Sequence, residues 1–356
     1  MQIRAMEGTC LAEAVALAIP ICQQAERACP RCGPGRKPEF PDWQMAMLIM
    51  VAIANHKKSK SAQYRYLREH QQQLNELLNA DRFPCRSTYF DRYRRAHRLF
   101  SIAIRLHGAK AVRYGWADAE VVAVDKSVIA ARGPVWHRHQ GRNRRPRRGV
   151  DREATWGRNE HDGWVYGYGY EVVVSCGKKG VLWPLLASVD HASRGESVSF
   201  REKILDLPEP TRYVLADRAY DADDNSEAIE WTNEERRTGR HFLCPTIERY
   251  NARRPRQQAW KESKERKRRR AHREQRKQFL QTKRGKRLYA RRSQTVEPFN
   301  SWLKTLFELE DRVWHRGIDN NRTQLTAAVF IYQLLLRINH NRGQNNGQIK
   351  WILDTL

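Results

Sequence analysis

The hydrophobic pattern of this 356-residue chain changes at Ala119. Before that residue, apolar side chains recur three and four positions apart, as in the series Trp43, Met47, Met50 and Ala54, which is typical of amphipathic helices. After it, runs of β-branched and aromatic residues predict strands. We therefore expect two domains, or one large domain with additions, with helices first and a sheet later.

The helical part is divided by a turn-rich, basic stretch at residues 33–38. This stretch separates an N-terminal helical segment, residues 1–32, from a unit over residues 33–116. Residues that can cap a helix recur in this unit: Asp42, Ser59 or Ser61, and Ser87. The last of these helices is basic, and its exposed face carries Arg92, Arg94, Arg95 and Arg98. Short helices joined by turns favour a helix-turn-helix-like DNA-binding domain, and a plain helical bundle with solvated charges is the alternative.

Residues 117–356 contain five segments that predict strands: 121–125, 165–175, 181–189, 213–217 and 241–245. Helical patterns over residues 193–207 and 221–237 separate the last three. Strands that follow one another early, with helical crossovers later, predict an α/β fold with a mixed five-stranded sheet and flanking helices. This order resembles that of an RNase H-like core.

Three acidic residues stand where metal-dependent chemistry would need them. Asp125 closes the apolar run 121–124, Asp217 closes the run 213–216, and Glu297 opens a helical pattern. A carboxylate at the end of a buried strand lies at the rim of the sheet, where it can face solvent and a metal ion. Two such Asp residues and one helical Glu could hold two divalent cations for phosphodiester chemistry.

Each of these acids also has an ordinary structural explanation. An Asp after a strand can be a turn residue that bonds its own backbone, and a Glu near a helix N-terminus is stabilised by the helix dipole. Three further acids, Asp221, Asp223 and Asp224, compete with Asp217 for the second position. We favour Asp217 because it directly ends the apolar run, whereas a turn and a helix cap are expected at the later three.

The formal net charge of +26, from 66 basic and 40 acidic side chains, predicts attraction to a polyanion. Nucleic acid is the first candidate. A membrane surface is less favoured, because no run of about 18 uncharged apolar residues occurs and the basic segments lack a strong apolar face.

The positive charge is concentrated in two stretches that interrupt the strand pattern. A basic loop over residues 132–158 contains Arg142, Arg144, Arg145, Arg147 and Arg148. A basic insertion over residues 246–292 is denser, since residues 253–292 hold 19 Lys or Arg and three acidic residues. Its centre contains Arg266, Lys267, Arg268, Arg269 and Arg270. Such runs are often only solvated charge, but this one leads into Glu297, so we favour contact with DNA.

The seven cysteines are odd in number and widely spread, which fits reduced thiols better than a disulfide framework. Cys29 and Cys32 have zinc-ligand spacing, but no second pair stands at the distance of a zinc finger, so zinc binding stays an open alternative. Acidic residues interrupt the apolar N-terminal stretch and no clean cleavage site follows it. We expect a cytoplasmic, nucleoid-associated protein.

Four segments together resemble an insertion-sequence transposase of the DDE class. They are residues 123–127, residues 167–171, residues 215–220, and the stretch from Tyr289 through Glu297 to Lys304. The C-terminal signature of the family is Tyr, two residues, Arg, three residues, Glu, six residues and Lys. Tyr289 and Arg292 match its first spacing and Glu297 and Lys304 its last, although four residues separate Arg292 from Glu297.

The resemblance implies a role for each matching residue. Asp125, Asp217 and Glu297 would bind two Mg²⁺ ions, for which Mn²⁺ would substitute, and the enzyme would cut the element's ends and join them to target DNA. Lys304, Tyr289 and Arg292 would hold phosphates near the break. The expected partners are double-stranded DNA and a second copy of the chain, with no membrane and no small-molecule substrate.

Two other functions fit the same residues. One is a DNA-binding protein that keeps the fold without cutting, and the other is a metal-dependent nuclease on the same core. The presence of all three acids favours an active enzyme, and the Tyr, Glu and Lys spacing favours a transposase over a general nuclease. A final helical stripe from Leu325 to Leu336 is expected to close the core, with a dimer seam as the alternative.

Overall fold

The structure is a computed structural model that describes residues 10–29, 39–137, 148–159, 163–177, 181–232, 236–237, 239–246, 263–344 and 346–355. The arginines predicted for DNA contact at positions 142, 144, 145 and 147 lie outside these ranges, as does Cys32. The six cysteines that are described are free thiols. Within the described ranges, no helix is both long and apolar enough to cross a bilayer.

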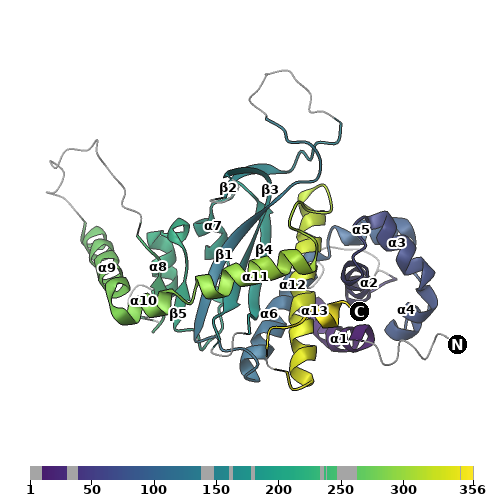
Figure 1. Ribbon diagram of the computed structural model, residues 1–356, viewed down its shortest axis with the longest axis horizontal. Helices are drawn as coiled ribbons and strands as arrows, with labels where there is room; N and C mark the ends of the chain where they lie inside the picture. Colours follow the sequence, from purple (N-terminus) through teal and green to yellow (C-terminus); the bar gives the residue numbers. More distant parts are fainter. Residues whose placement is uncertain are drawn as a thin grey trace.

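A mixed sheet lies at the centre of the molecule (Figure 1). Its strands are β1 (Val121–Ala130), β2 (Thr155–Asn159), β3 (Gly163–Ser175), β4 (Pro184–His191), β5 (Tyr213–Leu215) and β8 (His241–Leu243). β3 pairs antiparallel with β1 on one side and with β2 and β4 on the other, while β1, β5 and β8 are parallel neighbours. Apart from the short strand β2, the three antiparallel strands β1, β3 and β4 followed by the two parallel strands β5 and β8 form the RNase H-like α/β fold that the sequence predicts.

The β1–β3 pairing depends on a glycine. A Cβ atom at Gly167 would lie 2.0 Å from the carbonyl oxygen of Ile129, so a larger residue would force the two backbones apart. On the same pair of strands, the apolar run from Val121 to Val124 is buried. Such a continuous run suits a strand that is covered on both faces of the sheet.

Helices precede, interrupt and follow the sheet. The first group comprises α1 (Cys10–Ala28), α2 (Asp42–Ala54), α3 (Lys60–Glu69), α4 (Gln71–Leu78), α5 (Arg86–Tyr93) and α6 (His97–Arg113). The middle group comprises α7 (Glu196–Arg201), the 3₁₀ turns η2 (Ile204–Asp206) and η3 (Arg218–Tyr220), and α8 (Asp223–Glu230). The last group comprises α9 (Lys264–Gln281), α10 (Lys283–Tyr289), α11 (Ser293–Leu306), α12 (Ile318–Asn341) and α13 (Lys350–Leu353).

The two ends of the chain share one hydrophobic core. Helices α1, α2 and α6 pack against one another and against α12, and both α6 and α12 also contact β4. In α12 the predicted stripe is buried from Leu325 to Leu336, so it closes the core of the single chain. The division into domains at residues 32 and 116 stays a prediction.

Two sequence predictions of element boundaries in and around the sheet were wrong. A sixth strand, β2, forms at the end of the predicted basic loop because Trp156 and its neighbours extend the sheet along β3. The helix predicted over residues 221–237 ends at Glu230, where Trp231 turns to extended geometry and β6 (Trp231–Thr232) pairs with β7 (Arg236–Arg237). Aromatic and β-branched residues favour this strand conformation over a further helical turn.

Candidate active site

Asp125 lies in the middle of β1, not at its end. β3 pairs with β1 as far as Ala130, so the prediction that the strand stops at Asp125 was wrong. On the other side, however, β5 pairs only with residues 121–123 of β1. The edge of β1 next to Asp125 is therefore not covered by β5. Instead, the Asp125 side chain contacts Asn300 of α11 and Arg292, the residue that precedes this helix.

Asp217 follows β5 by two residues. It caps η3, since its Oδ1 accepts a hydrogen bond from the backbone N–H of Ala219 at 2.8 Å. Asp217 thus has the structural role expected of an Asp that follows a strand, because its side chain bonds the backbone of the turn. Its other carboxylate oxygen lies 3.6 Å from the Arg292 guanidinium, so the same side chain also faces the residues around Asp125.

Glu297 lies on α11, which runs past β1 in front of the sheet (Figure 1). The helix begins at Ser293, so Pro298 is its sixth residue and lies inside the helix, beyond the first turn where a proline is best accommodated. Glu297 is the fifth residue of the helix, at the start of its second turn. Its side chain is exposed.

Arg292 and Asn300 connect α11 to Asp125. Arg292 donates a hydrogen bond to Oδ1 of Asp125 at 2.7 Å, and the amide nitrogen of Asn300 donates to Oδ2 at 2.8 Å. The amide oxygen of Asn300 in turn accepts from the Tyr170 hydroxyl of β3 at 2.8 Å. Both oxygens of Asp125 are therefore engaged, and Asn300 fixes the distance between α11 and the sheet.

The charges of Asp217 and Glu297 both act on the Asp125 carboxylate. Burial raises the pKa of Asp125 to about 6; the nearby Arg292 opposes this shift, and the negative charges of Asp217 and Glu297 add to it. The carboxylates thus repel one another, with Arg292 as the cation that pairs with both Asp125 and Asp217.

Sequence reasoning missed a fourth acid, Glu196, at the start of α7. Burial raises its pKa to about 8, and the charges of Asp217 and Asp125 contribute to the shift, while Lys126 opposes it. Lys126 itself donates to the carbonyl oxygens of Ala192 at 2.9 Å and Arg194 at 2.5 Å. We call Asp125, Asp217, Glu297 and Glu196 the acid cluster. No motif marks Glu196, because only the fold brings α7 to this edge of the sheet.

Three carboxylates are a donor set that Mg²⁺ prefers. The position of Arg292 between Asp125 and Asp217 shows that a cation is stabilised there. Within the described part of the chain, however, no three His, Cys, Asp or Glu side chains stand close enough together to hold a metal ion. The residues fit a divalent cation chemically, provided that Arg292 releases Asp125.

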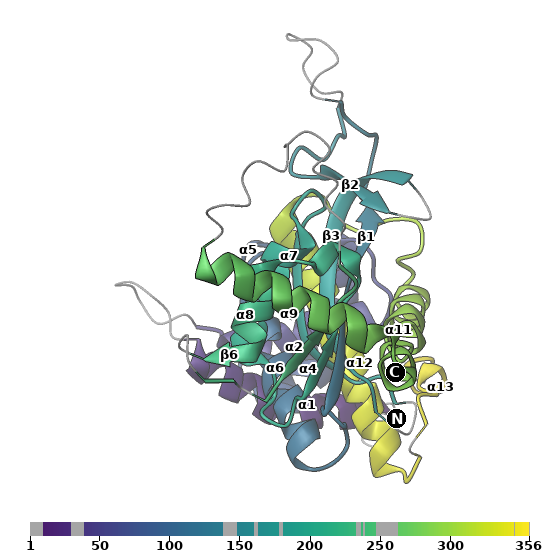
Figure 2. The same ribbon diagram turned by 90° about the vertical axis from the view of Figure 1, so that its left-hand side faces the viewer.

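The basic helix α9 lies across α8 (Figure 2). Several of its cations pair with acids of α8 and of the turn before it. Arg269 contacts Glu227 at 2.9 Å, Arg273 contacts Asp223 at 2.7 Å, and the buried Arg276 contacts the buried Asp221 at 2.5 Å. We call these contacts the α8–α9 ion pairs.

The other residues predicted to bind DNA are spread over the surface. On α9, Arg268 contacts Glu227 at 3.3 Å, while Arg266, Lys267 and Arg270 are exposed. Arg94 and Arg95 are exposed between α5 and α6, and Arg148 is exposed near β2. Tyr289 and Lys304 are partly buried on the two sides of Glu297 in the sequence. The structure thus brings Tyr289 and Arg292 to the acid cluster but leaves Arg94 and Arg95 in a separate helical region.

Comparison with known protein families gives a match over most of the chain. Residues 116–334 match the family described as "Transposase DDE domain". A solved structure with a similar course of the chain is the cryo-EM structure of a piggyBac transposase synaptic complex with hairpin DNA. It is 9% identical, the match covers 97% of this chain and 78% of that one, and the TM-score is 0.41. No curated protein matches the chain.

Proposed function

Since this chain belongs to the transposase DDE domain family, we propose that it cuts DNA at the ends of its own insertion sequence and joins the freed 3′-OH ends to target DNA. The observation that supports the proposal best is the meeting of Asp125 and Asp217 at Arg292, with the charge of Glu297 acting on Asp125. These acids come from positions 125, 217 and 297 of the sequence, and no structural ion pair explains Glu297 among the described residues.

Asp125, Asp217 and Glu297 would hold the divalent cations. Bound Mg²⁺ would polarise the phosphodiester and stabilise charge on the leaving oxygen. Asn300 would keep the Asp125 carboxylate oriented, because its amide is fixed from the other side by Tyr170.

Arg292 has two roles in this proposal. In the free protein it neutralises Asp125 and Asp217. When DNA binds, a phosphate competes for the guanidinium, which is suited to bidentate contact with phosphate oxygens. The exchange frees Asp125 for metal binding, and Tyr289 and Lys304 assist by contacting neighbouring phosphates.

Contact with the rest of the duplex is assigned to the basic surfaces. We propose that the helical region 33–116 binds DNA with Arg94 and Arg95, and that α9 binds phosphates with the exposed Arg266 and Lys267. A homodimer would bring two acid clusters to two element ends.

The test is a cleavage and joining assay with a duplex that carries the inverted repeat bracketing the gene. Wild-type protein with Mg²⁺ or Mn²⁺ should nick the end, and a second labelled duplex should become joined to it. Asp125→Asn should reduce cleavage by about 1,000-fold or more, because metal ligation contributes several kcal/mol to such reactions. Asp224→Asn is the matched control, since Asp224 pairs with Arg201 at 3.0 Å on the surface.

Each outcome separates the alternatives. Cleavage that depends on Asp125 but is never followed by joining would indicate a nuclease. Tight binding of the duplex without cleavage by any variant would indicate a non-cutting DNA-binding protein. Equal activity of Asp125→Asn and wild type would remove the acid cluster from the chemistry.

A further inference from the structure

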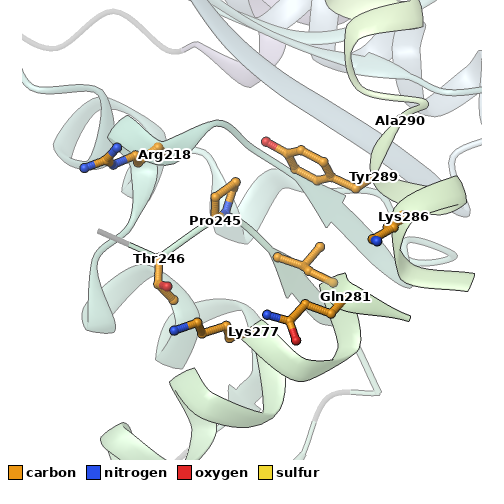
Figure 3. A pocket seen from close by; sticks show the side chains of 9 residues that line it. Arg218, Pro245, Thr246, Lys277, Gln281, Lys286, Tyr289 and Ala290 are labelled. Carbon is orange, nitrogen blue, oxygen red and sulfur yellow. The ribbon is translucent and has the colours of Figure 1, made fainter. Parts of the chain in front are cut away.

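A pocket of about 510 Å³ lies between η3, the end of β8 and the helices α9 and α10 (Figure 3). Its walls come from three places: Arg218 in η3, Pro245 and Thr246 after β8, and residues of α9 and α10. Figure 3 shows Lys277 projecting from α9, with Tyr289 and Lys286 on α10 across the opening. The volume is within the range of about 300–1,000 Å³ that small-molecule sites occupy.

The lining combines cations with apolar surface. Arg218, Lys277 and Lys286 border the pocket, and none of the lining residues that the structure describes is acidic. Within the described part of the chain, neither Arg218 nor Lys286 forms an ion pair, and both are exposed. Pro245, Leu280 and the ring of Tyr289 supply the apolar part. This chemistry fits an anionic group that is attached to an apolar or ring-shaped unit.

Two residues that line the pocket, Arg218 and Tyr289, contact or follow the chain directly beside Asp217. Arg218 follows Asp217 directly in the chain. The hydroxyl of Tyr289 donates to the backbone carbonyl of Ala216, the preceding residue, at 3.1 Å. The pocket therefore adjoins Asp217, the acid-cluster residue that lies between Ala216 and Arg218.

We propose that this pocket binds one sugar–phosphate unit of the DNA strand, adjacent to the phosphodiester that the acid cluster cuts. Arg218 and Lys286 hold the phosphate, and Pro245, Leu280 and the Tyr289 ring contact the deoxyribose. The inference rests on the proposed function for the identity of the strand. Its chemistry requires only that DNA occupies this edge of the sheet.

The experiment measures binding in EDTA, without catalysis. The probe is a set of duplexes carrying the terminal inverted repeat, each with a single uncharged methylphosphonate at one position near the cut. At one position, the substitution should weaken wild-type binding by about tenfold, as expected for loss of a charge-assisted contact of 1.5 kcal/mol or more. In Arg218→Gln and Lys286→Gln, the same substitution should change the affinity by less than about twofold, because the contact is already lost.

Lys283→Gln and Arg287→Gln are the controls. Both residues are exposed on α10 and neither lines the pocket. They should keep the full methylphosphonate effect. If all four variants keep it, or if Lys286→Gln weakens every duplex equally without any positional coupling, the pocket does not bind a particular phosphate.

Failure of the pocket and failure of the proposed function give different results. Positional coupling in EDTA without any Mg²⁺-dependent cleavage would leave the pocket assigned and the enzyme activity rejected. Cleavage and joining with no coupling at Arg218 or Lys286 would reject the pocket alone. Replacing the neighbouring base by an abasic site tests the unit that is bound. The affinity should stay within about twofold if the sugar is the contacted part, and a larger loss would assign the pocket to the base.

Discussion

The acid cluster and the α8–α9 ion pairs are built from the same residue types but balance their charges differently. In the α8–α9 ion pairs each acid has a close arginine, as in the contacts of Asp221 with Arg276 and of Glu227 with Arg269. In the acid cluster, Asp125 and Asp217 share Arg292, and burial and mutual repulsion raise the pKa of Asp125. Acids with matched cations hold elements together, whereas acids with too few cations are suited to bind a further cation.

This difference also distinguishes Asp217 from the acids that follow it. Asp221, Asp223 and Asp224 have ion-pair partners at 2.5, 2.7 and 3.0 Å, respectively. Asp217 has its nearest cation at 3.6 Å, and it shares that cation with Asp125. The comparison supports the proposal that Asp217, and none of the three acids after it, is the second catalytic acid.

The largest effect on stability is expected when a matched pair is broken. Arg276 is 5% exposed, and it also donates to the Ser226 hydroxyl at 2.7 Å. Arg276→Met would leave Asp221 buried without its closest partner, which should lower the free energy of unfolding by about 3–5 kcal/mol. Urea denaturation followed by circular dichroism would measure the change.

The control for that variant is an exposed pair. Arg82 contacts Glu39 at 3.2 Å, and both side chains are more than half exposed. Arg82→Met should change the free energy of unfolding by less than about 1 kcal/mol. A loss of similar size in both variants would mean that the α8–α9 contacts are no stronger than surface ion pairs.

In the acid cluster, removing a charge should raise the free energy of unfolding instead of lowering it. Burial raises the pKa of Asp125 from 3.8 in the unfolded chain to about 6 in the folded protein, so folding disfavours its charged form. The cost develops between those two pKa values as the pH rises and is complete above pH 6. In metal-free buffer at pH 7.5, Asp125→Asn should therefore stabilise the protein by about 3 kcal/mol.

The pH dependence provides the internal check on this prediction. At pH 4 Asp125 is largely protonated in the folded protein, so wild type and Asp125→Asn should differ little in unfolding free energy. Destabilisation by Asp125→Asn at pH 7.5 would show that Arg292 fully compensates Asp125, and the proposed contrast with the α8–α9 ion pairs would disappear.

The sequence predicted the core strands because their apolar runs are local features. It also placed Asp125, Asp217 and Glu297 on the elements that converge. It could not predict that β1 continues past Asp125, because that length depends on pairing with residues 167–171 of β3, which are distant in the sequence. Nor could it identify Glu196 or Asn300, whose roles depend on where α7 and α11 pack.

Charge was the least informative sequence signal about individual contacts. The run from Arg266 to Arg270 appears uniformly basic in the sequence, yet Arg268 and Arg269 contact Glu227 of α8. Helical periodicity alone divides the run into two faces, but the acids that one face meets belong to a separate element. The family resemblance added the roles of Tyr289 and Arg292, and the structure brings both to the cluster.

Removing the cation from the acid cluster should improve metal binding by the free protein. Arg292→Ala would free an oxygen of Asp125 that a charged hydrogen bond of roughly 1.5–3 kcal/mol now occupies. The affinity for Mn²⁺, measured by electron paramagnetic resonance without DNA, should rise by about tenfold. Cleavage should nevertheless fall, because the phosphate contact is lost as well.

Arg291 supplies the matched control for Arg292. It donates to the backbone carbonyl of Cys176 and contacts no acid of the cluster. Arg291→Ala should leave the Mn²⁺ affinity unchanged. If Arg292→Ala also leaves it unchanged, Arg292 does not compete with the metal and the proposed exchange on DNA binding is wrong.

The smallest effect is expected on the exposed side of α9, and it concerns salt dependence. Arg266 and Lys267 are exposed and form no ion pair within the described residues. Replacing both with Gln should reduce the slope of log affinity against log salt by about 2, since each phosphate contact contributes roughly 0.9. Arg268→Gln should reduce it by clearly less than the roughly 0.9 expected for one free cation, because Arg268 already pairs with Glu227 at 3.3 Å. Fluorescence anisotropy with one duplex over a series of NaCl concentrations measures both slopes. A reduction of about 0.9 in Arg268→Gln would show that DNA displaces the contact of Arg268 with Glu227, and the contrast between matched and unmatched charges would then hold only for the free protein.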